Sequence, residues 1–256
     1  MGFFLHLLGI PDLCAVTVSF PLVDDPSTSL LAWTTTPWTL PSNLALCVNP
    51  DYTYIKIEDQ ERQQKFILHE NLLRTLYKDP KKAKYKKLGY YKGSEMKGWR
   101  YVPLFDYFVD KVRGSPTLPG AMRHSHYDTQ YEAKAFRVLV DTYVTDADGT
   151  GIVHQAPAFG DDDHRVLLAN GVIAAEEMPP CPIDDGGKFT EEVTDFVGQH
   201  VKVRKLFSPG FVNLLAHFRK AADKEIQKVL KAKGRLIVQS TINHQYPFCW
   251  RYIVFP

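Results

Sequence analysis

The sequence predicts an α+β fold in which a β-barrel-like core of strands carries peripheral helices. Short segments with the period-two alternation of strands recur along the chain, separated by turns rich in Pro, Asp and Gly. Few segments have helical spacing, and strands and helices do not alternate as they do around a parallel sheet. The 256 residues are 45% hydrophobic and 23% charged, which is typical of a globular chain.

The clearest strand pattern lies near the start of the chain. Val16, Val18 and Phe20 alternate with Thr17 and Ser19. One side chain in two then faces a core, as expected for a half-buried strand. The same reasoning predicts further strands at 52–57, 101–109, 135–145, 149–154 and 236–238.

Helical patterns appear in three places. Leucines at helical spacing predict a helix over 66–77. Acidic residues at its beginning favour a short helix over 163–170. The clearest apolar stripe predicts a helix over 223–233, which Gly234 would end in a left-handed conformation.

The cysteine spacing and the lack of long apolar runs exclude several classes of protein. The net charge of +2 argues little for or against a nucleic-acid partner. The four cysteines are scattered and form no CxxC pair, so we expect neither a disulfide framework nor a four-thiolate zinc site, and we expect a reducing, cytoplasmic compartment. No apolar run approaches the ~20 residues that span a bilayer, so no membrane partner is expected.

A basic run occupies residues 78–87. Such a run is usually a solvated loop. The sharper interpretation is a phosphate contact, because clustered lysines supply the salt-dependent part of RNA affinity. The candidate RNA-binding residues are Lys81, Lys82, Lys84, Lys86 and Lys87.

The most informative segment is WTTTPWTLPSN, residues 33–43. Hydroxyl and amide side chains crowd beside two Trp and two Pro on a stiffened backbone. This pattern indicates a pocket for a small polar ligand. The two tryptophans, Trp33 and Trp38, are expected to pack rather than to contact the ligand.

A second segment, GTGIVHQAPAFGDDDH at 149–164, predicts a strand that ends at His154 and an acidic helix start. Taken alone, such a histidine is more often structural, and three Asp at a helix start are more often caps. A metal site built from His154, Asp161, Asp163 and His164 is conceivable, but the EF-hand spacing is absent. Neither a nucleophile elbow nor a Walker A loop occurs. The residues alone therefore predict a polar pocket of open purpose.

Together, these two segments resemble the editing (CP1) domain of isoleucyl-tRNA synthetases of the cytosolic eukaryotic type. The segments LFDYF (104–108), VTDF (193–196) and YPFCWR (246–251) are also similar. The valine and leucine enzymes carry an Arg in the Thr-rich peptide, where this chain has TPW at 36–38. The resemblance covers most of residues 16–251 and implies the aminoacyl-tRNA synthetase editing-domain fold.

The resemblance implies hydrolysis of the ester of valine mischarged on tRNA(Ile). One methylene in an apolar pocket is worth only ~1–3 kcal/mol, a limit for which this synthetase is itself the usual illustration. A second, smaller site that cleaves the valyl ester supplies the missing fidelity. The implied partner is thus tRNA(Ile) carrying valine.

Residue roles follow from the same resemblance. Asp163 would hold the ammonium group of the amino acid, and Thr36 and Thr39 would act beside it as catalytic positioners. Three further residues would bind the substrate: Thr35, Asn43 and His154. His154 would form the wall that excludes isoleucine. No metal, cofactor or covalent intermediate is expected.

The chain departs from the family in several places. The HIGH and KMSKS signatures are absent, so no aminoacylation is expected from this chain without the synthetic core of a longer protein. Segments 1–15 and 252–256 match nothing, and inserts at about 112–130 and 203–221 interrupt the family pattern. We interpret these pieces as translated non-coding sequence. The alternative is that they are genuine surface loops, because the surfaces of folded domains tolerate insertions. Two alternative functions stay open: a non-catalytic tRNA-binding module and an inactive truncated product.

Overall fold

The computed structural model describes residues 13–108, 134–176, 178–201 and 221–242. The strands are β1 (Leu13–Pro21), β2 (Thr28–Thr34), β3 (Ala45–Val48), β4 (Thr53–Asp59), β5 (Gln64–His69), β6 (Tyr85–Lys92), β7 (Val138–Val140), β8 (Ile152–Gln155) and β9 (Leu236–Ile242). The helical segments are η1 (Pro37–Ser42), η2 (Glu70–Leu72), α1 (Leu73–Leu76), η3 (Gly93–Met96), α2 (Asp161–Ala169) and α4 (Ala221–Ala232).

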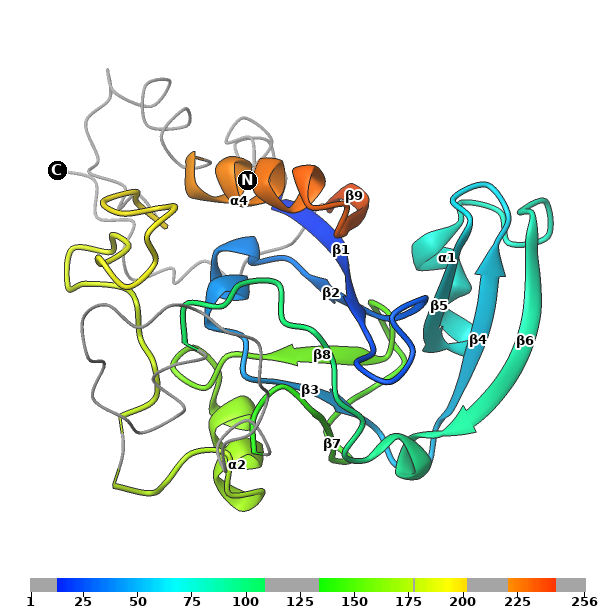
Figure 1. Cartoon of the computed structure of the whole chain (residues 1–256), viewed down its shortest axis with the longest axis horizontal. Helices are drawn as coiled ribbons and strands as arrows, with labels where there is room; N and C mark the ends of the chain where they lie inside the picture. Colours follow the sequence, from blue (N-terminus) through cyan, green and yellow to red (C-terminus); the bar gives the residue numbers. More distant parts are fainter. Residues whose placement is uncertain (1–12, 109–133, 177, 202–220, 243–256) are drawn as a thin grey trace, which may run out of the picture.

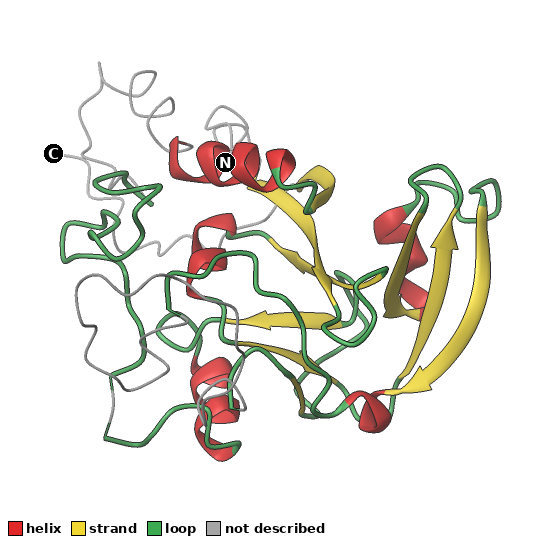
Figure 2. Ribbon diagram, in the orientation of Figure 1, coloured by secondary structure: helices red, strands yellow, loops and turns green. Residues whose placement is uncertain are grey.

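The strands form two sheets (Figure 1). One has six strands in the order β6-β4-β5-β2-β1-β9, and the other has three in the order β7-β3-β8. Most pairs are antiparallel, but β2–β5 and β3–β7 are parallel. The predicted α+β class is confirmed. The barrel-like core is instead a pair of open sheets, because no strand of the described residues joins the edges of either sheet (Figure 2).

The main core lies where the two sheets approach each other. Val16, Val18 and Phe20 of β1 are buried there, as predicted. Thr17 and Ser19 are buried as well, at 1% and 4% exposed. The alternation pointed to one covered face, but the side chains on both faces of β1 are buried.

Strands β4, β5 and β6 and helix α1 form a lobe at one side of the molecule (Figure 1). The predicted helix over 66–77 is wrong for its first half, because β5 occupies 64–69 and α1 only 73–76. Phe66, Ile67 and Leu68 are consecutive and all buried, which is typical of a strand covered on both faces. Periodicity alone cannot separate such a run from a buried helix.

The remaining predictions differ from the structure mainly at element boundaries. In the described part of the predicted strand 101–109, which ends at Phe108, Tyr101 forms an isolated bridge with Leu22 and the residues after it form an irregular loop. Within 135–145 only β7 is a strand. Helices α2 and α4 each begin two residues earlier than predicted, and β9 begins at the predicted residue but extends to Ile242.

The predicted domain limits fall partly outside the described residues. Strand β1 begins at Leu13, so the last residues of the unmatched segment 1–15 pair with β9. The insert at 112–130 and segments 246–251 and 252–256 lie outside the described residues. So does the insert at 203–221, apart from Ala221, where α4 begins. The division of the chain therefore stays a prediction. Within the described part, no helix is both long and apolar enough to cross a membrane.

Candidate functional site

A cavity of about 160 Å³ lies where the end of β2, helix η1, the end of β8 and the start of α2 meet. The Thr-rich peptide and the second segment, 116 residues apart at their starts, therefore form opposite walls of one site. The lining residues are Trp33, Thr34, Thr36, Thr39, Val153, His154, Ala156, Phe159 and Asp163.

Helix η1 presents the two catalytic threonines predicted from the resemblance. Pro37 stands at its first position, where a missing N–H costs nothing. Both the backbone N–H and the hydroxyl of Thr39 donate to the carbonyl oxygen of Thr36, at 3.0 and 2.9 Å. These two hydrogen bonds to one carbonyl oxygen place the side chains of Thr36 and Thr39 beside each other, with their Oγ1 atoms 3.4 Å apart.

The hydroxyl groups form a chain along the pocket wall. Thr34 Oγ1 lies 3.1 Å from Thr36 Oγ1 and accepts the backbone N–H of Thr36 at 3.1 Å. Thr39 Oγ1 in turn lies 2.9 Å from His154 Nε2. Since Thr39 gives its proton to a carbonyl, Nε2 of His154 must carry the hydrogen of this contact.

His154 is therefore a neutral and fixed part of the wall. Its Nδ1 lies 3.5 Å from the amide nitrogen of Asn43, which can only donate, so both ring nitrogens have partners. Burial lowers the pKa of His154 to about 4, so the ring does not act as a base or carry charge at neutral pH. These contacts suit a rigid steric boundary.

Asp163 differs from the two acidic residues that precede it. Asp161 and Asp162 are exposed, whereas Asp163 faces the cavity. Its Oδ2 accepts the backbone N–H of Ala156 at 3.0 Å, and its Oδ1 accepts the hydroxyl of Tyr143 at 3.3 Å. Burial raises the pKa of Asp163 to about 6, and the hydrogen bonds from Ala156 and Tyr143 partly offset this rise. The carboxylate is thus largely ionised at pH 7 and only partly neutralised by the protein.

Two predicted substrate-binding residues lie off this cavity. Asn43 is buried behind His154, where it accepts the Tyr101 hydroxyl at 2.7 Å and donates to the Ala45 carbonyl at 2.9 Å. Thr35 lines a neighbouring cavity of about 340 Å³. That cavity lies between the end of β2 and the loop 143–153 and shares Trp33, Thr34 and Val153 with the first.

Several lining residues were not predicted. Trp33 borders both cavities, and its ring packs on Gly149, where an added Cβ would lie 3.2 Å from it. Trp38 does pack as expected, edge-on to Phe159 at 4.9 Å between ring centroids. Tyr143 carried no sequence signal at all, because it reaches Asp163 from a loop 20 residues earlier in the chain.

No group of three or more His, Cys, Asp or Glu side chains within the described residues could hold a metal ion. The conceivable set of His154, Asp161, Asp163 and His164 is accordingly not brought together.

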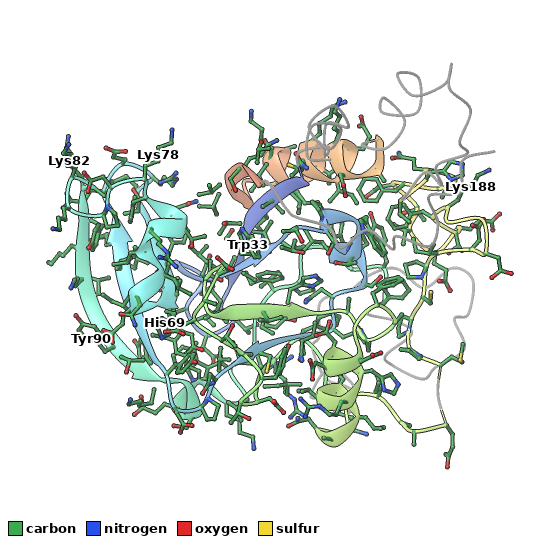
Figure 3. The ribbon with its side chains drawn as sticks, turned by 180° about the vertical axis from the view of Figure 1, so that it is seen from behind. Trp33, His69, Lys78, Lys82, Tyr90 and Lys188 are labelled. Atoms are coloured by element: carbon green, nitrogen blue, oxygen red, sulfur yellow. The ribbon has the colours of Figure 1, made fainter. Side chains whose placement is uncertain are left out.

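The candidate tRNA-binding lysines are all exposed and lie on the lobe. Lys81, Lys82 and Lys84 precede β6, and Lys86 and Lys87 belong to it, so the basic run is not one loop. Figure 3 places Lys82 at the end of the lobe, well away from Trp33.

No protein-family model matches the chain. It is 48% identical to the cytoplasmic isoleucine–tRNA ligase of Mus musculus over 93% of this chain and 16% of that protein. It is 46% identical to the cytoplasmic isoleucine–tRNA ligase of Saccharomyces cerevisiae over 93% of this chain and 19% of that protein. The chain thus spans less than a fifth of the length of these relatives.

Two solved structures match the chain to different extents. GlLeuRS-CP1 matches 88% of this chain and 99% of its own, with a TM-score of 0.51 and 14% identity. The P. knowlesi cytosolic leucyl-tRNA synthetase editing domain matches 60% of each chain, with a TM-score of 0.41 and 16% identity. In sequence the chain corresponds to one segment of isoleucine–tRNA ligases, and its fold is similar to that of GlLeuRS-CP1.

Proposed function

We propose that the pocket hydrolyses the ester of valine mischarged on tRNA(Ile). The observation that carries this proposal is the grouping of one carboxylate, a chain of hydroxyls and an apolar wall in a single small cavity. An α-amino acid ester presents a cation, a polar ester and an apolar side chain, and each has a counterpart here.

The size of the cavity favours a small amino acid. A cavity of about 150 Å³ accepts a molecule as large as benzene. The 160 Å³ cavity is therefore suited to a valyl group and not to a nucleotide. Because Thr39 and Asn43 hold the His154 ring from both sides, the ring cannot easily move to admit the extra methylene of isoleucine.

Asp163 is the group that receives the ammonium. A nearby cation favours the ionised carboxylate, so binding lowers the pKa of Asp163 from its raised value and strengthens the ion pair. Fixing the ammonium also fixes the ester carbon two bonds away, which converts the encounter with water into a positioned reaction.

The hydroxyl chain positions the attacking water and the ester. The water oxygen bonds to the ester carbonyl carbon, the bond from that carbon to the ribose oxygen breaks, and the ribose oxygen takes up the proton released by the water. The products are valine and tRNA. Thr39 is committed to the Thr36 carbonyl, so the Thr36 hydroxyl is the donor in its long contact with Thr39. When the ester is bound, this hydroxyl turns to donate toward the cavity and stabilises developing charge.

The second cavity accommodates the nucleoside side of the ester. It adjoins the first across Trp33 and is about twice as large. Thr35 lies there, so its part in substrate binding would be contact with the terminal nucleotide of the tRNA.

The decisive experiment incubates the purified chain with valyl-tRNA(Ile) and follows loss of the ester, with isoleucyl-tRNA(Ile) as the comparison. We expect slow cleavage of the valyl ester and sparing of the isoleucyl ester. Asp163→Ala should abolish cleavage, and Thr36→Ala should lower its rate. Asn43→Ala should also lower it, by releasing His154. Binding of the tRNA without ester loss would support the non-catalytic module instead.

A further inference from the structure

Tyr143 contacts the Asp163 carboxylate from the side opposite to the Ala156 N–H, yet it does not line the small cavity. We propose that Tyr143 is the positioning residue of Asp163, and that Gln155 and the Asp141–Arg165 pair hold its hydroxyl against the carboxylate that receives the substrate ammonium. This inference rests on the proposed function.

The direction of the Tyr143 proton follows from its neighbours. The amide Nε2 of Gln155 donates to the Tyr143 oxygen at 3.4 Å. An ionised carboxylate only accepts, so the single phenolic proton points to Asp163 Oδ1. Gln155 is fully buried, and its Oε1 has no hydrogen-bond partner among the described residues. Burial raises the pKa of Tyr143, which keeps it a donor.

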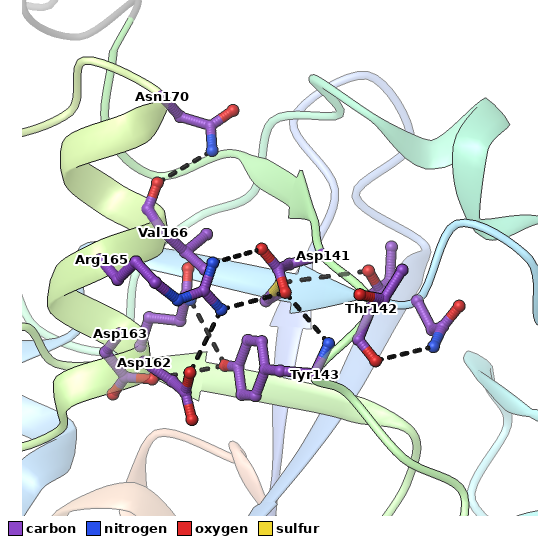
Figure 4. A network of polar contacts seen from close by, with 12 residues as sticks. Asp141, Thr142, Tyr143, Asp162, Asp163, Arg165, Val166 and Asn170 are labelled. Carbon is purple, nitrogen blue, oxygen red and sulfur yellow. Dashed lines mark hydrogen bonds and ion pairs between the residues drawn. The ribbon is translucent and has the colours of Figure 1, made fainter.

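An ion pair holds the Tyr143 backbone in place (Figure 4). The Arg165 guanidinium donates to both oxygens of Asp141, at 2.9 and 3.1 Å, and Asp141 Oδ1 accepts the backbone N–H of Tyr143 at 3.0 Å. Arg165 also lies over the Tyr143 ring, 6.0 Å from its centroid. Because Arg165 stands two residues after Asp163 in α2, this pair fixes the helix and the tyrosine relative to each other.

Other charged and titratable groups around Asp163 do not replace the tyrosine. Asp162 raises the pKa of Asp163, and Arg165 directs its guanidinium to Asp141 and Asp162. The groups that face Asp163 are Asp162 and Arg165 from α2, Asp141 and Tyr143 from the loop after β7, Cys47 from β3 and His154 from β8. Burial keeps Cys47 and His154 uncharged at neutral pH. Tyr143 is therefore the side chain that donates to this carboxylate.

The structural part is tested on Tyr143→Phe, which keeps the ring beneath Arg165 and removes the hydroxyl. Carbon-13 NMR of aspartate-labelled protein, with the resonance assigned through Asp163→Asn, follows the titration of Asp163. Its pKa should rise by about one unit, as expected when a carboxylate loses one charge-assisted hydrogen bond. The matched control is Tyr107→Phe, which removes a hydroxyl from Asp195 away from the pocket. An unchanged pKa in Tyr143→Phe overturns the proposal.

The kinetic part follows kcat/KM for valyl-tRNA(Ile) between pH 5 and 8. The acidic limb of Tyr143→Phe should move up by the same unit, with a loss of about tenfold at pH 5, about fivefold at pH 6 and almost none at pH 8. A loss that is equal at every pH contradicts a positioning role. A wild-type chain that cleaves no ester contradicts the proposed function, while the NMR titration still decides the role of Tyr143. If Tyr143→Phe does not fold, Gln155→Leu releases the phenol and should shift the titration in the same direction.

Discussion

The Asp163 carboxylate is held in surroundings that disfavour its charge. Its pKa of about 6 lies above the 3.8 of a free carboxyl, so the folded state binds its proton more tightly than the unfolded state. Stability linked to this group is greatest at low pH and is lost as pH rises through about 6. The carboxylate that we propose as the ammonium-binding group thereby destabilises the fold at neutral pH.

Asp163→Asn should therefore stabilise the protein while abolishing ester cleavage. At pH 7 we expect the free energy of unfolding to rise by about 2 kcal/mol, because the charge is no longer buried. At pH 4 the gain should nearly vanish. Denaturant unfolding at the two pH values measures both, with exposed Asp161→Asn as the control. A gain of the same size at pH 4 would contradict this account.

The pH dependence of hydrolysis should report the same carboxyl. Once the uncatalysed rate is subtracted, kcat/KM should fall below about pH 6, because protonated Asp163 no longer attracts the ammonium. His154, with a pKa of about 4, should contribute no change between pH 5 and 8. If kcat/KM stays constant down to pH 5, the ionised Asp163 carboxylate is not required for hydrolysis.

His154→Ala should relax selectivity. Removing the ring opens space for one more methylene. Cleavage of isoleucyl-tRNA(Ile) relative to valyl-tRNA(Ile) should therefore rise about tenfold or more, which is the discrimination that one methylene gives in an apolar pocket. The ratio of the two kcat/KM values measures this. His164→Ala, which changes a histidine outside the cavity lining, is the control. An unaltered ratio would make His154 purely structural.

At the scale of elements, helix η1 depends on a distant partner. It holds two prolines within six residues, and its capping residue Thr36 makes no side-chain cap. The backbone N–H of Trp38 donates instead to Asp223 Oδ1 of α4, at 3.1 Å and 185 residues away. Helix α4 thus fixes the segment that carries Thr36 and Thr39.

Asp223→Ala should consequently loosen η1. We expect a loss of about 1 kcal/mol in the free energy of unfolding, as for other lost helix-start acceptors. The ester cleavage rate should also fall, because Thr36 and Thr39 lose their fixed positions. Thermal unfolding and valyl-tRNA(Ile) cleavage measure the two effects. Glu225→Ala on the same helix serves as the control. Unchanged cleavage would show that η1 stands without α4.

At the scale of the whole molecule, the lobe carries its lysines away from the pocket. Lys78 and Lys82 lie at the end of the lobe and Lys188 at the opposite end of the molecule (Figure 3). A tRNA whose acceptor end enters the pocket could place phosphates along the lobe. This arrangement favours a contact that raises affinity without touching the reacting ester.

The triple change Lys81→Gln, Lys84→Gln and Lys87→Gln should weaken tRNA(Ile) binding and flatten its dependence on salt. The slope of log affinity against log salt should decrease by about 2–3, near one per lost phosphate contact. Titrations at several salt concentrations measure it. The matched triple Lys188→Gln, Lys224→Gln and Lys231→Gln should leave the slope unchanged. Equal slopes for wild type and the lobe variant would show that these lysines are solvated and contact no tRNA phosphate.

Local pattern was sufficient for elements whose side chains face one core. The stripe of α4 and the alternation of β1 depend on neighbouring residues, and both elements lie where they were predicted. The segment 66–77 was not predictable in this way. Its apolar run became β5 because β4, the preceding strand of a hairpin, and β2, more than 30 residues earlier, supply hydrogen-bond partners on both sides.

The candidate site divides along the same line. The sequence by itself determined the chemistry of the two walls, because hydroxyl, imidazole and carboxylate groups are properties of residue types. Only the tertiary structure decided that Asp163 is desolvated beside the cavity, which tautomer His154 adopts, and that Tyr143 donates to the Asp163 carboxylate. Desolvation and hydrogen bonding set those properties, and both depend on atoms that folding brings from β3, β8, η1 and the loop after β7.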